Sequence, residues 1–185
     1  PLNLEIAPTK EMLKIALYQK PKYICIVPEK RTEVTTEGGL DLKKKALFIK
    51  NMIKEFNKKN IRVSLFIEPK ISDIKISKDL GAGAVEIHTG KYCNAFNLNK
   101  NVKTEFAKIS KAAEFAYKMG LEVHAGHGLT YSSAYKISKI KYIKEFNIGH
   151  FIVSESIFLG LKNPIKKFIK IINSLKWKYL ELAQI

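Results

Sequence analysis

Short apolar runs alternate with longer segments of helical periodicity along the whole chain. Nearly continuous apolar runs of this kind are typical of parallel strands that are covered on both faces. These runs predict six strands. The first five are Leu2 to Ala7, Tyr23 to Val27, Val63 to Ile67, Val85 to His88 and Glu122 to Ala125. The sixth is expected to begin near Asn147 and to contain the apolar residues Phe151 to Val153.

The segments between these strands carry apolar residues three and four positions apart, which predicts helices. Thr9 is a candidate N-cap for the first helix, and Gly120 suits the C′ position of a later one. The predicted helices lie near Met12 to Leu17, Ala46 to Phe56, Ile71 to Leu80, Phe106 to Ala116, Ala134 to Ile140 and Ile165 to Leu175.

Strands that alternate with helices predict an α/β fold with a parallel sheet. Two architectures fit about six βα units: an open, doubly wound sheet, or a TIM (β/α)₈ barrel that lacks two units. No linker or low-complexity tract divides residues 1–185, so we expect a single domain.

The net charge of +16 first suggests a nucleic-acid-binding protein. Of the 33 basic residues, however, only Arg31 and Arg62 are arginine, and the lysines are spread over every predicted helix. Arginine is the usual residue for bidentate recognition of bases and phosphates. We therefore expect solvated lysine-rich faces and no nucleic-acid partner, with a positive field that attracts phosphorylated substrates.

The apolar content and the cysteines narrow the class of protein further. No run approaches the ~20 apolar residues of a membrane-spanning helix, so no membrane partner is expected. Cys25 and Cys93 are far apart in the sequence, which argues against a disulfide framework and against a cysteine-based metal site. A reducing, cytoplasmic location is the expectation.

In both candidate architectures, ligands bind at the carboxyl ends of the strands. Alternation along a strand places Glu86 with His88, and Glu122 with His124, on one face. A barrel would gather such inward-facing groups around one pocket, although His88 and His124 also fit satisfied core histidines. All the histidines and several carboxylates are predicted at or within strand ends: His88, His124, His127, His150, Glu5, Glu68, Glu86 and Glu122.

Two glycine-containing segments are the sharpest candidates for chemistry. His127 lies between Gly126 and Gly128, and flanking glycines allow unusual backbone angles and close approach of a ligand. A histidine in such a loop suits proton transfer near neutral pH. Gly149 and His150 precede a short helix expected near residues 154–161, whose N-terminus could bind a phosphate.

Several of these segments resemble the pyridoxine 5′-phosphate synthase (PdxJ) family, in its order and approximate spacing. The EGGLD and AGHGL runs are the most specific. The matching segments span residues 3–150: Asn3 to Glu5, Val27 to Arg31, Val34 to Asp41, Glu86 to Gly90, Ala125 to Leu129 and Asn147 to His150.

The resemblance implies a (β/α)₈ barrel that condenses 1-deoxy-D-xylulose 5-phosphate with 3-amino-2-oxopropyl phosphate. The products would be pyridoxine 5′-phosphate, phosphate and water, without a metal or an organic cofactor. By the same resemblance, Glu5 matches the general base, His127 the proton donor and Glu86 a transition-state stabiliser. The positions that match substrate or phosphate contacts are Thr35, Gly128, Gly149 and His150.

The chain departs from the family pattern at its start. The family's Asn-x-Asp-His motif of the first strand, and the motif after the second strand with a further catalytic histidine, do not occur in it. We therefore expect an N-terminally incomplete barrel domain over residues 1–185, with the two missing strands located before Pro1. The resemblance also implies a homo-oligomer, an octamer built from dimers.

Two other functions remain as alternatives. A metal-dependent barrel hydrolase would use the strand-end histidines and carboxylates, but no His-x-His or His-Glu-x-x-His spacing occurs in the sequence. A lysine-rich nucleic-acid-binding protein would leave the carboxylates in the strands unexplained. Metal analysis would test the first alternative, and steeply salt-dependent nucleic-acid binding the second.

Overall fold

Six parallel strands form one curled sheet in the computed structural model, which describes residues 1–28 and 38–182. The strands follow one another in the order β1 to β6, and each pairs with the next. They are β1 (Asn3–Ile6), β2 (Tyr23–Ile26), β3 (Arg62–Ile67), β4 (Ala84–His88), β5 (Glu122–Gly126) and β6 (Ile143–Asn147).

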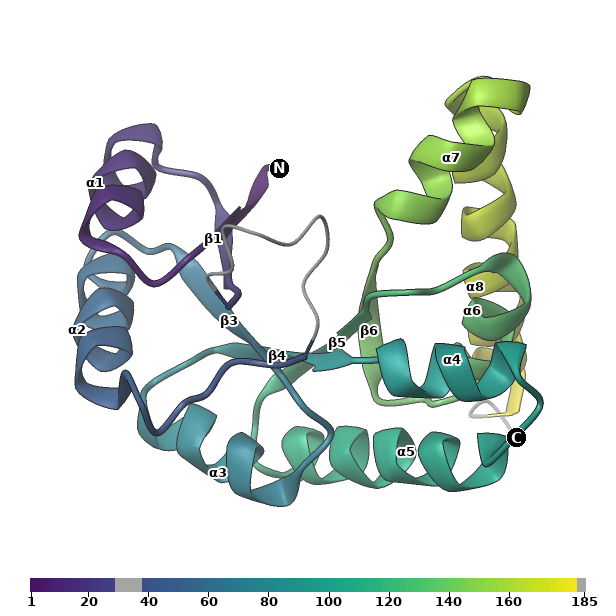
Figure 1. Cartoon of the computed structure of the whole chain (residues 1–185), viewed down its shortest axis with the longest axis horizontal. Coiled ribbons are helices and arrows are strands. Elements are labelled where there is room, and N and C mark those ends of the chain that lie inside the picture. The colour runs from purple at the N-terminus through teal and green to yellow at the C-terminus, as the bar shows by residue number, and fades with distance from the viewer. Residues whose placement is uncertain (29–37, 183–185) are drawn as a thin grey trace.

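The helices lie around the outer, convex side of this sheet, and its concave side opens between β1 and β6 (Figure 1). This arrangement confirms the predicted α/β class and is a curled half-barrel, not a flat sheet with helices on both faces. The helices are α1 (Lys10–Gln19), α2 (Ala46–Asn57), α3 (Ile71–Asp79), α4 (Gly90–Asn97), α5 (Val102–Lys118), α6 (Tyr131–Ile137), α7 (His150–Leu159) and α8 (Lys162–Leu182).

Local sequence signals set several helix boundaries. Thr9 Oγ1 accepts a hydrogen bond of 3.1 Å from the backbone N–H of Met12, which confirms Thr9 as the N-cap of α1. Gly120, two residues after the end of α5, adopts a φ of +73°, the left-handed conformation of a C′ residue. Both capping residues could be predicted from the sequence because capping depends on residues that are close in the chain.

The hydrophobic core lies between the sheet and its helices. Ile24, Leu65 and Ile87 project outward from β2, β3 and β4 and are fully buried. Met52 and Phe56 of α2 are fully buried in the same core, and burial of each such side chain stabilises the fold by roughly 1.5–3 kcal/mol. The alternate positions of these strands face inward, so the concave side is free to carry polar groups.

The sixth predicted strand is wrong in position. Phe151 to Val153 belong to α7, and the strand itself is Ile143–Asn147. Lys144 and Glu145 interrupt its apolar pattern. β6 is at an edge of the sheet, and its Glu145 lies beside Arg62 and accepts a hydrogen bond from Asn3. The helix expected near residues 154–161 therefore begins earlier, at His150.

Two further helix predictions need correction. The segment after β4 forms α4, which the sequence reading did not predict. The helix expected to reach Ile140 ends at Ile137. Within residues 1–28 and 38–182, no helix combines the length and the apolar character that a membrane crossing requires.

Candidate active site

A cavity of about 750 Å³ opens on the concave side of the sheet, at the carboxyl ends of the strands. It brings together six of the seven residues that the sequence reading selected as site residues. Thr35, the seventh, lies outside the described residues. The six selected residues that line the cavity are Glu5, Glu86, His127, Gly128, Gly149 and His150.

Glu86 forms the floor of this cavity. It projects inward from β4 and is only 2% exposed. Its Oε2 accepts hydrogen bonds from Asn147 Nδ2 at 2.5 Å and from the Cys25 thiol at 3.3 Å. A Cβ atom at Gly126 on the neighbouring strand would collide with Glu86 Oε1, so glycine there makes room for the carboxyl group.

Burial raises the pKa of Glu86 to about 7, against the opposing effect of its hydrogen bonds from Asn147 and Cys25. The nearby negative charges of Glu5 and Glu145 raise it further. A carboxyl group with this pKa is present in both protonation forms near neutral pH. It can therefore donate or accept a proton during a reaction.

Glu5 on β1 lies opposite Cys25 of β2 in the sheet, and its side chain is exposed to the cavity. Partial loss of water around it raises the pKa of its carboxyl group. Atoms of Glu5, Cys25 and Glu86 all lie within 4.8 Å of one another. Two carboxyl groups this close disfavour a second negative charge, which suits one as a base and the other as an acid.

His127 enters the cavity from the loop after β5. Its backbone has a φ of +77°, an unusual conformation for a residue with a side chain. The Thr89 hydroxyl, fully buried, lies 2.7 Å from the carbonyl oxygen of Gly126 and 2.6 Å from that of His127. This hydroxyl holds the loop in its strained backbone conformation, and in this conformation His127 lines the cavity.

The N-terminus of α7 also lines the cavity. Gly149 is its N-cap and His150 its first residue, and both line the cavity with Phe151. A Cβ atom at Gly149 would meet nothing within 4 Å, so the space in front of the helix is open. The first backbone N–H groups of a helix attract anions, and this end of α7 can therefore bind a phosphate group.

Glu68, just after β3, and His88, at the end of β4, lie directly behind His127. The Nδ1 of His88 is 2.9 Å from Glu68 Oε1, and the rings of His88 and His127 are 4.8 Å apart between centroids. Burial alone would raise the pKa of Glu68. Hydrogen bonds from Lys91, His88 and the backbone N–H of Gly39 outweigh burial and lower this pKa to about 2.

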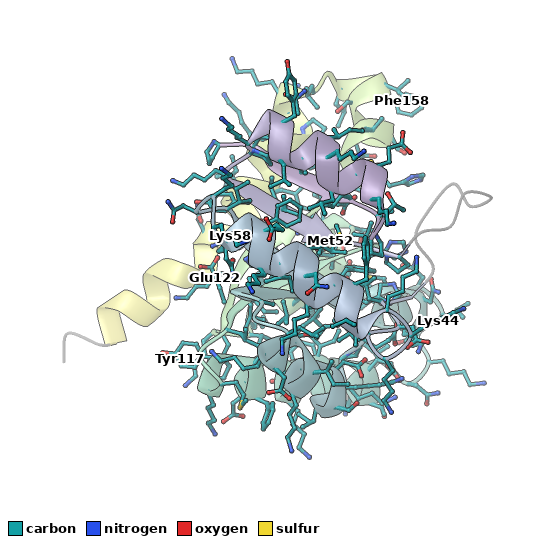
Figure 2. The ribbon with its side chains drawn as sticks, turned by 90° about the vertical axis from the view of Figure 1, so that its left-hand side faces the viewer. Lys44, Met52, Lys58, Tyr117, Glu122 and Phe158 are labelled. Carbon is teal, nitrogen blue, oxygen red and sulfur yellow. The ribbon has the colours of Figure 1, made fainter. Side chains whose placement is uncertain are left out.

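His124 and Glu122 do not belong to this cavity, which corrects the prediction that they lie with the other strand-end groups. They face inward as alternation predicts, but near the amino end of the sheet, where β5 begins. His124 Nε2 lies 3.0 Å from Glu122 Oε1, and Arg62 Nη1 lies 2.7 Å from the same oxygen. Figure 2 shows Glu122 on the side of Lys58, which follows α2, and away from Lys44.

These groups at the amino end form a structural network. His124 is fully buried, and Arg62 also approaches Glu145 Oε2 at 3.7 Å and lies over the ring of Tyr23. Glu145 Oε1 accepts a hydrogen bond of 3.1 Å from Asn3 Nδ2, which links β6 to β1. The Arg62 guanidinium lies beside both carboxylates, so charge pairing accounts for their position in the sheet.

Sequence reasoning missed three residues that shape the cavity: Cys25, Asn147 and Phe66. Cys25 and Asn147 hold Glu86 by hydrogen bonds, and Phe66 packs against the rings of His88 and His127. The partner of Glu5 across the sheet is Cys25, but the strand register that pairs them is not legible in a single sequence.

The chain is similar to known proteins of one family. A family model described as pyridoxal phosphate biosynthesis protein PdxJ matches residues 1–174. The chain is 57% identical over 171 residues to a pyridoxine 5′-phosphate synthase of Pelagibacter ubique, covering 92% of this chain and 72% of that protein. A synthase of the same name from Sulfurihydrogenibium sp. is 51% identical over 172 residues, covering 93% and 70% of the two chains.

Two solved structures share the fold at low sequence identity. The crystal structure of the Amycolatopsis orientalis BexX/CysO complex matches with a TM-score of 0.56 at 12% identity, covering 91% of this chain and 62% of that chain. The crystal structure of citrate synthase SbnG matches with a TM-score of 0.55 at 11% identity, covering 94% and 74%. At such identities the likeness shows the fold alone.

Proposed function

The chain belongs to the PdxJ family of pyridoxal phosphate biosynthesis proteins, and we propose from this that it is a pyridoxine 5′-phosphate synthase. It condenses 1-deoxy-D-xylulose 5-phosphate with 3-amino-2-oxopropyl phosphate and releases phosphate and water. The observation that carries this proposal is the single cavity that joins two close carboxyl groups, a glycine-flanked histidine and a helix N-terminus.

The reaction requires several proton transfers, and the cavity offers groups suited to each. An amine adds to a ketone, water leaves, phosphate is eliminated and a ring closes. Glu5, whose pKa is raised, acts as the general base that removes protons from carbon or nitrogen. His127 returns a proton to the leaving oxygen. Glu86, protonated in part near neutral pH, stabilises the charge that develops between them.

The two phosphate groups of the substrates need anion sites that do not hydrolyse them. The N-terminus of α7, with Gly149 and His150, supplies one such site through backbone N–H groups. Gly128, at a φ of +77°, exposes backbone next to His127 and contacts substrate. Thr35 completes the set of substrate contacts in this proposal.

The curled sheet is, in this proposal, part of a closed (β/α)₈ barrel that forms a single domain. β1 and β6 are the edges of the sheet formed by the described residues, and exposed edges invite further pairing. Two further βα units that precede β1 in the chain would close the gap seen in Figure 1. They would also supply the remaining groups of the active site.

We extend the proposal to a homo-oligomer that works in the cytoplasm. Large apolar side chains are exposed on α7, among them Ile157 at 78% and Phe158 at 84%, and these favour contact with more protein. Figure 2 places Phe158 at an outer corner of the molecule. Cys25 and Cys93 are both free and buried, which suits a reducing compartment. Light scattering of the purified protein tests the oligomer.

The experiment that tests the function is a product assay on the full-length protein. Both phosphorylated substrates are supplied, formation of pyridoxine 5′-phosphate is followed by mass spectrometry, and each substrate is omitted in turn as a control. Product that requires both substrates supports the synthase. A folded protein that gives no product, and that carries a stoichiometric metal by elemental analysis, would favour the metal-dependent hydrolase instead.

A further inference from the structure

Glu68 is a nearly buried carboxylate that lines no part of the cavity, yet three donors converge on it. Its side chain is 13% exposed. Its Oε1 accepts hydrogen bonds from His88 Nδ1 at 2.9 Å and from the backbone N–H of Gly39 at 3.2 Å, and its Oε2 accepts one from Lys91 Nζ at 2.8 Å. Such a concentration of donors marks a carboxylate that is kept as an anion in a fixed place.

We propose that Glu68 and His88 form a positioning pair that holds the His127 imidazole in its working orientation and favours its protonated, proton-donating form. This inference rests on the proposed function, in which His127 is the proton donor. Neither Glu68 nor His88 is proposed to touch the substrate, since neither lines the cavity. They act on the reaction through His127.

The hydrogen-bond pattern fixes the tautomer of His88. The pKa of Glu68 is about 2, so its carboxylate is ionised near neutral pH and can only accept hydrogen bonds. His88 must therefore donate from Nδ1. In the neutral ring this leaves a lone pair on Nε2, a buried atom that has no hydrogen-bond partner among the described residues.

The packing brings this Nε2 and an edge of the His127 ring to the same place. A Cβ atom placed on Gly90 would lie 2.6 Å from His88 Nε2 and 3.0 Å from His127 Cδ2, so both ring edges converge on the bare backbone of Gly90. The ring planes of the two histidines make an angle of 59°, and Phe66 contacts both rings. The ring edge of an imidazolium carries positive charge, which the Nε2 lone pair and the Glu68 anion behind it stabilise.

Two separate restraints thus act on His127. The Thr89 hydroxyl holds its backbone at the strained φ, and the rings of His88 and Phe66 limit where its side chain can turn. Only the second restraint involves a charged group, because His88 is hydrogen-bonded to the Glu68 carboxylate. Removal of the charge on Glu68 should therefore affect the protonation of His127 more than the shape of the loop.

Other charged groups around His127 bear on its protonation too. Lys91 on α4 is paired with Glu68 and largely exposed, and the buried thiol of Cys93 lies 3.7 Å from the carbonyl oxygen of His127. Among the described residues, the titratable groups that line the cavity with His127 are Glu5, Cys25, Glu86 and His150. All of these remain in place when Glu68 alone is changed, so the change isolates its contribution.

The test is the Glu68→Gln variant, which keeps the size and the accepting oxygen of the side chain but removes its charge. We expect kcat to fall on the order of tenfold with KM changed less than about threefold, as is typical when a group that orients a catalytic histidine is lost. The alkaline limb of the kcat–pH profile should move to lower pH, because His127 then loses its proton more readily. Glu68→Asp should recover part of kcat.

Lys91→Gln is the matched control, because it removes only the outer, exposed partner of Glu68. We expect its kcat to stay within about twofold of the parent value, since surface ion pairs contribute little. A Glu68→Gln protein with the parent's kcat and the parent's pH profile would overturn the inference, and so would an equal loss in Lys91→Gln.

Nitrogen NMR of the histidine rings tests the same inference without any assay of activity. In the parent, His88 should be protonated on Nδ1, and the titration midpoint of His127 should lie higher than in Glu68→Gln. If the parent forms no pyridoxine 5′-phosphate, the proposed function fails while this spectrum still decides the positioning role. Unchanged His127 titration in Glu68→Gln would refute that role even in an active enzyme.

Discussion

At the scale of single residues, the carboxyl group of Glu86 makes the stability of the folded protein depend on pH. Its pKa is raised to about 7 in the folded protein by burial, from a reference value of 4.5. The folded state therefore holds a proton more tightly than the unfolded chain between these values. The stability that this group contributes is complete below pH 4.5 and is lost as the pH rises through about 7.

We predict that Glu86→Gln removes this loss. Between pH 5 and pH 8 the parent should lose up to ~3 kcal/mol of unfolding free energy relative to the variant, since each pH unit of differing protonation is worth about 1.4 kcal/mol. Urea unfolding of both proteins across this range measures the difference. Curves that stay parallel would mean that Glu86 is ionised at no cost in the fold. Loss of turnover in the same variant would report its role in the reaction.

The residues that sequence reading placed correctly are those whose chemistry is local. His127 stands out because its flanking glycines are adjacent in the sequence, and the structure places it in the cavity. His124 was predicted on the correct face of the sheet but at the wrong end of its strand. Alternation determines which face a strand residue points to and does not determine its position along the strand. Cys25 was missed because its partner Glu86 is 61 residues away.

At the scale of elements, the loop that carries His127 depends on the start of α4. The Thr89 hydroxyl is shared between the carbonyl oxygens of Gly126 and His127, and the Thr89 N–H also donates to Gly126 at 2.9 Å. One side chain thus connects the end of β4 to the end of β5. This connection holds the backbone that presents the proposed proton donor.

We predict that Thr89→Val lowers both stability and turnover. Valine has the same shape but cannot donate, so two buried carbonyl groups lose a partner, at a cost of about 1–3 kcal/mol in unfolding free energy. Because the loop is then freer to relax from its strained φ, kcat should fall at least severalfold. Chemical denaturation and the product assay measure the two effects.

Thr9→Ala supplies the control for this prediction. It removes the N-cap of α1, a residue that does not line the cavity, and should cost about 1 kcal/mol of unfolding free energy. Its kcat should equal that of the parent. If Thr9→Ala lost as much turnover as Thr89→Val, stability alone would explain both results and the loop restraint would not be needed.

Strands and helices were predictable where their apolar and polar residues follow the usual pattern for that element. The first five strands were located correctly from their apolar residues. β6 was missed and the start of α7 was predicted as a strand, because the strand carries Lys144 and Glu145 whereas the helix begins with a run of apolar residues. An edge strand that carries charged residues and a helix with exposed apolar residues both break the usual patterns.

At the scale of the whole molecule, the net charge of +16 should act on both stability and substrate capture. Repulsion among the lysines opposes folding, and salt screens it, so the unfolding free energy should rise with salt. The same screening weakens attraction of the doubly anionic phosphates. We predict that kcat/KM falls roughly twofold to tenfold between about 20 and 300 mM sodium chloride, with kcat little changed.

Steady-state kinetics and urea unfolding over one salt series check these opposite trends.

The curvature of the sheet could not be read from the sequence, because a curled and an open sheet contain the same alternating units. That curvature brings β1 and β6 close enough for Asn3 to reach Glu145, and it gathers the carboxyl ends of the strands around one cavity.

The most direct test of the account compares two histidine variants of the full-length protein in the assay for pyridoxine 5′-phosphate. His127 lies in the cavity, and His124, three residues earlier, lies in the ionic network at the amino end of the sheet. We predict that His127→Ala lowers kcat by about 100-fold or more, the usual effect of removing a general acid. His124→Asn should keep kcat within about threefold of the parent, although it lowers stability. Full activity in His127→Ala, or an equal loss in both variants, would contradict the assignment of the active site.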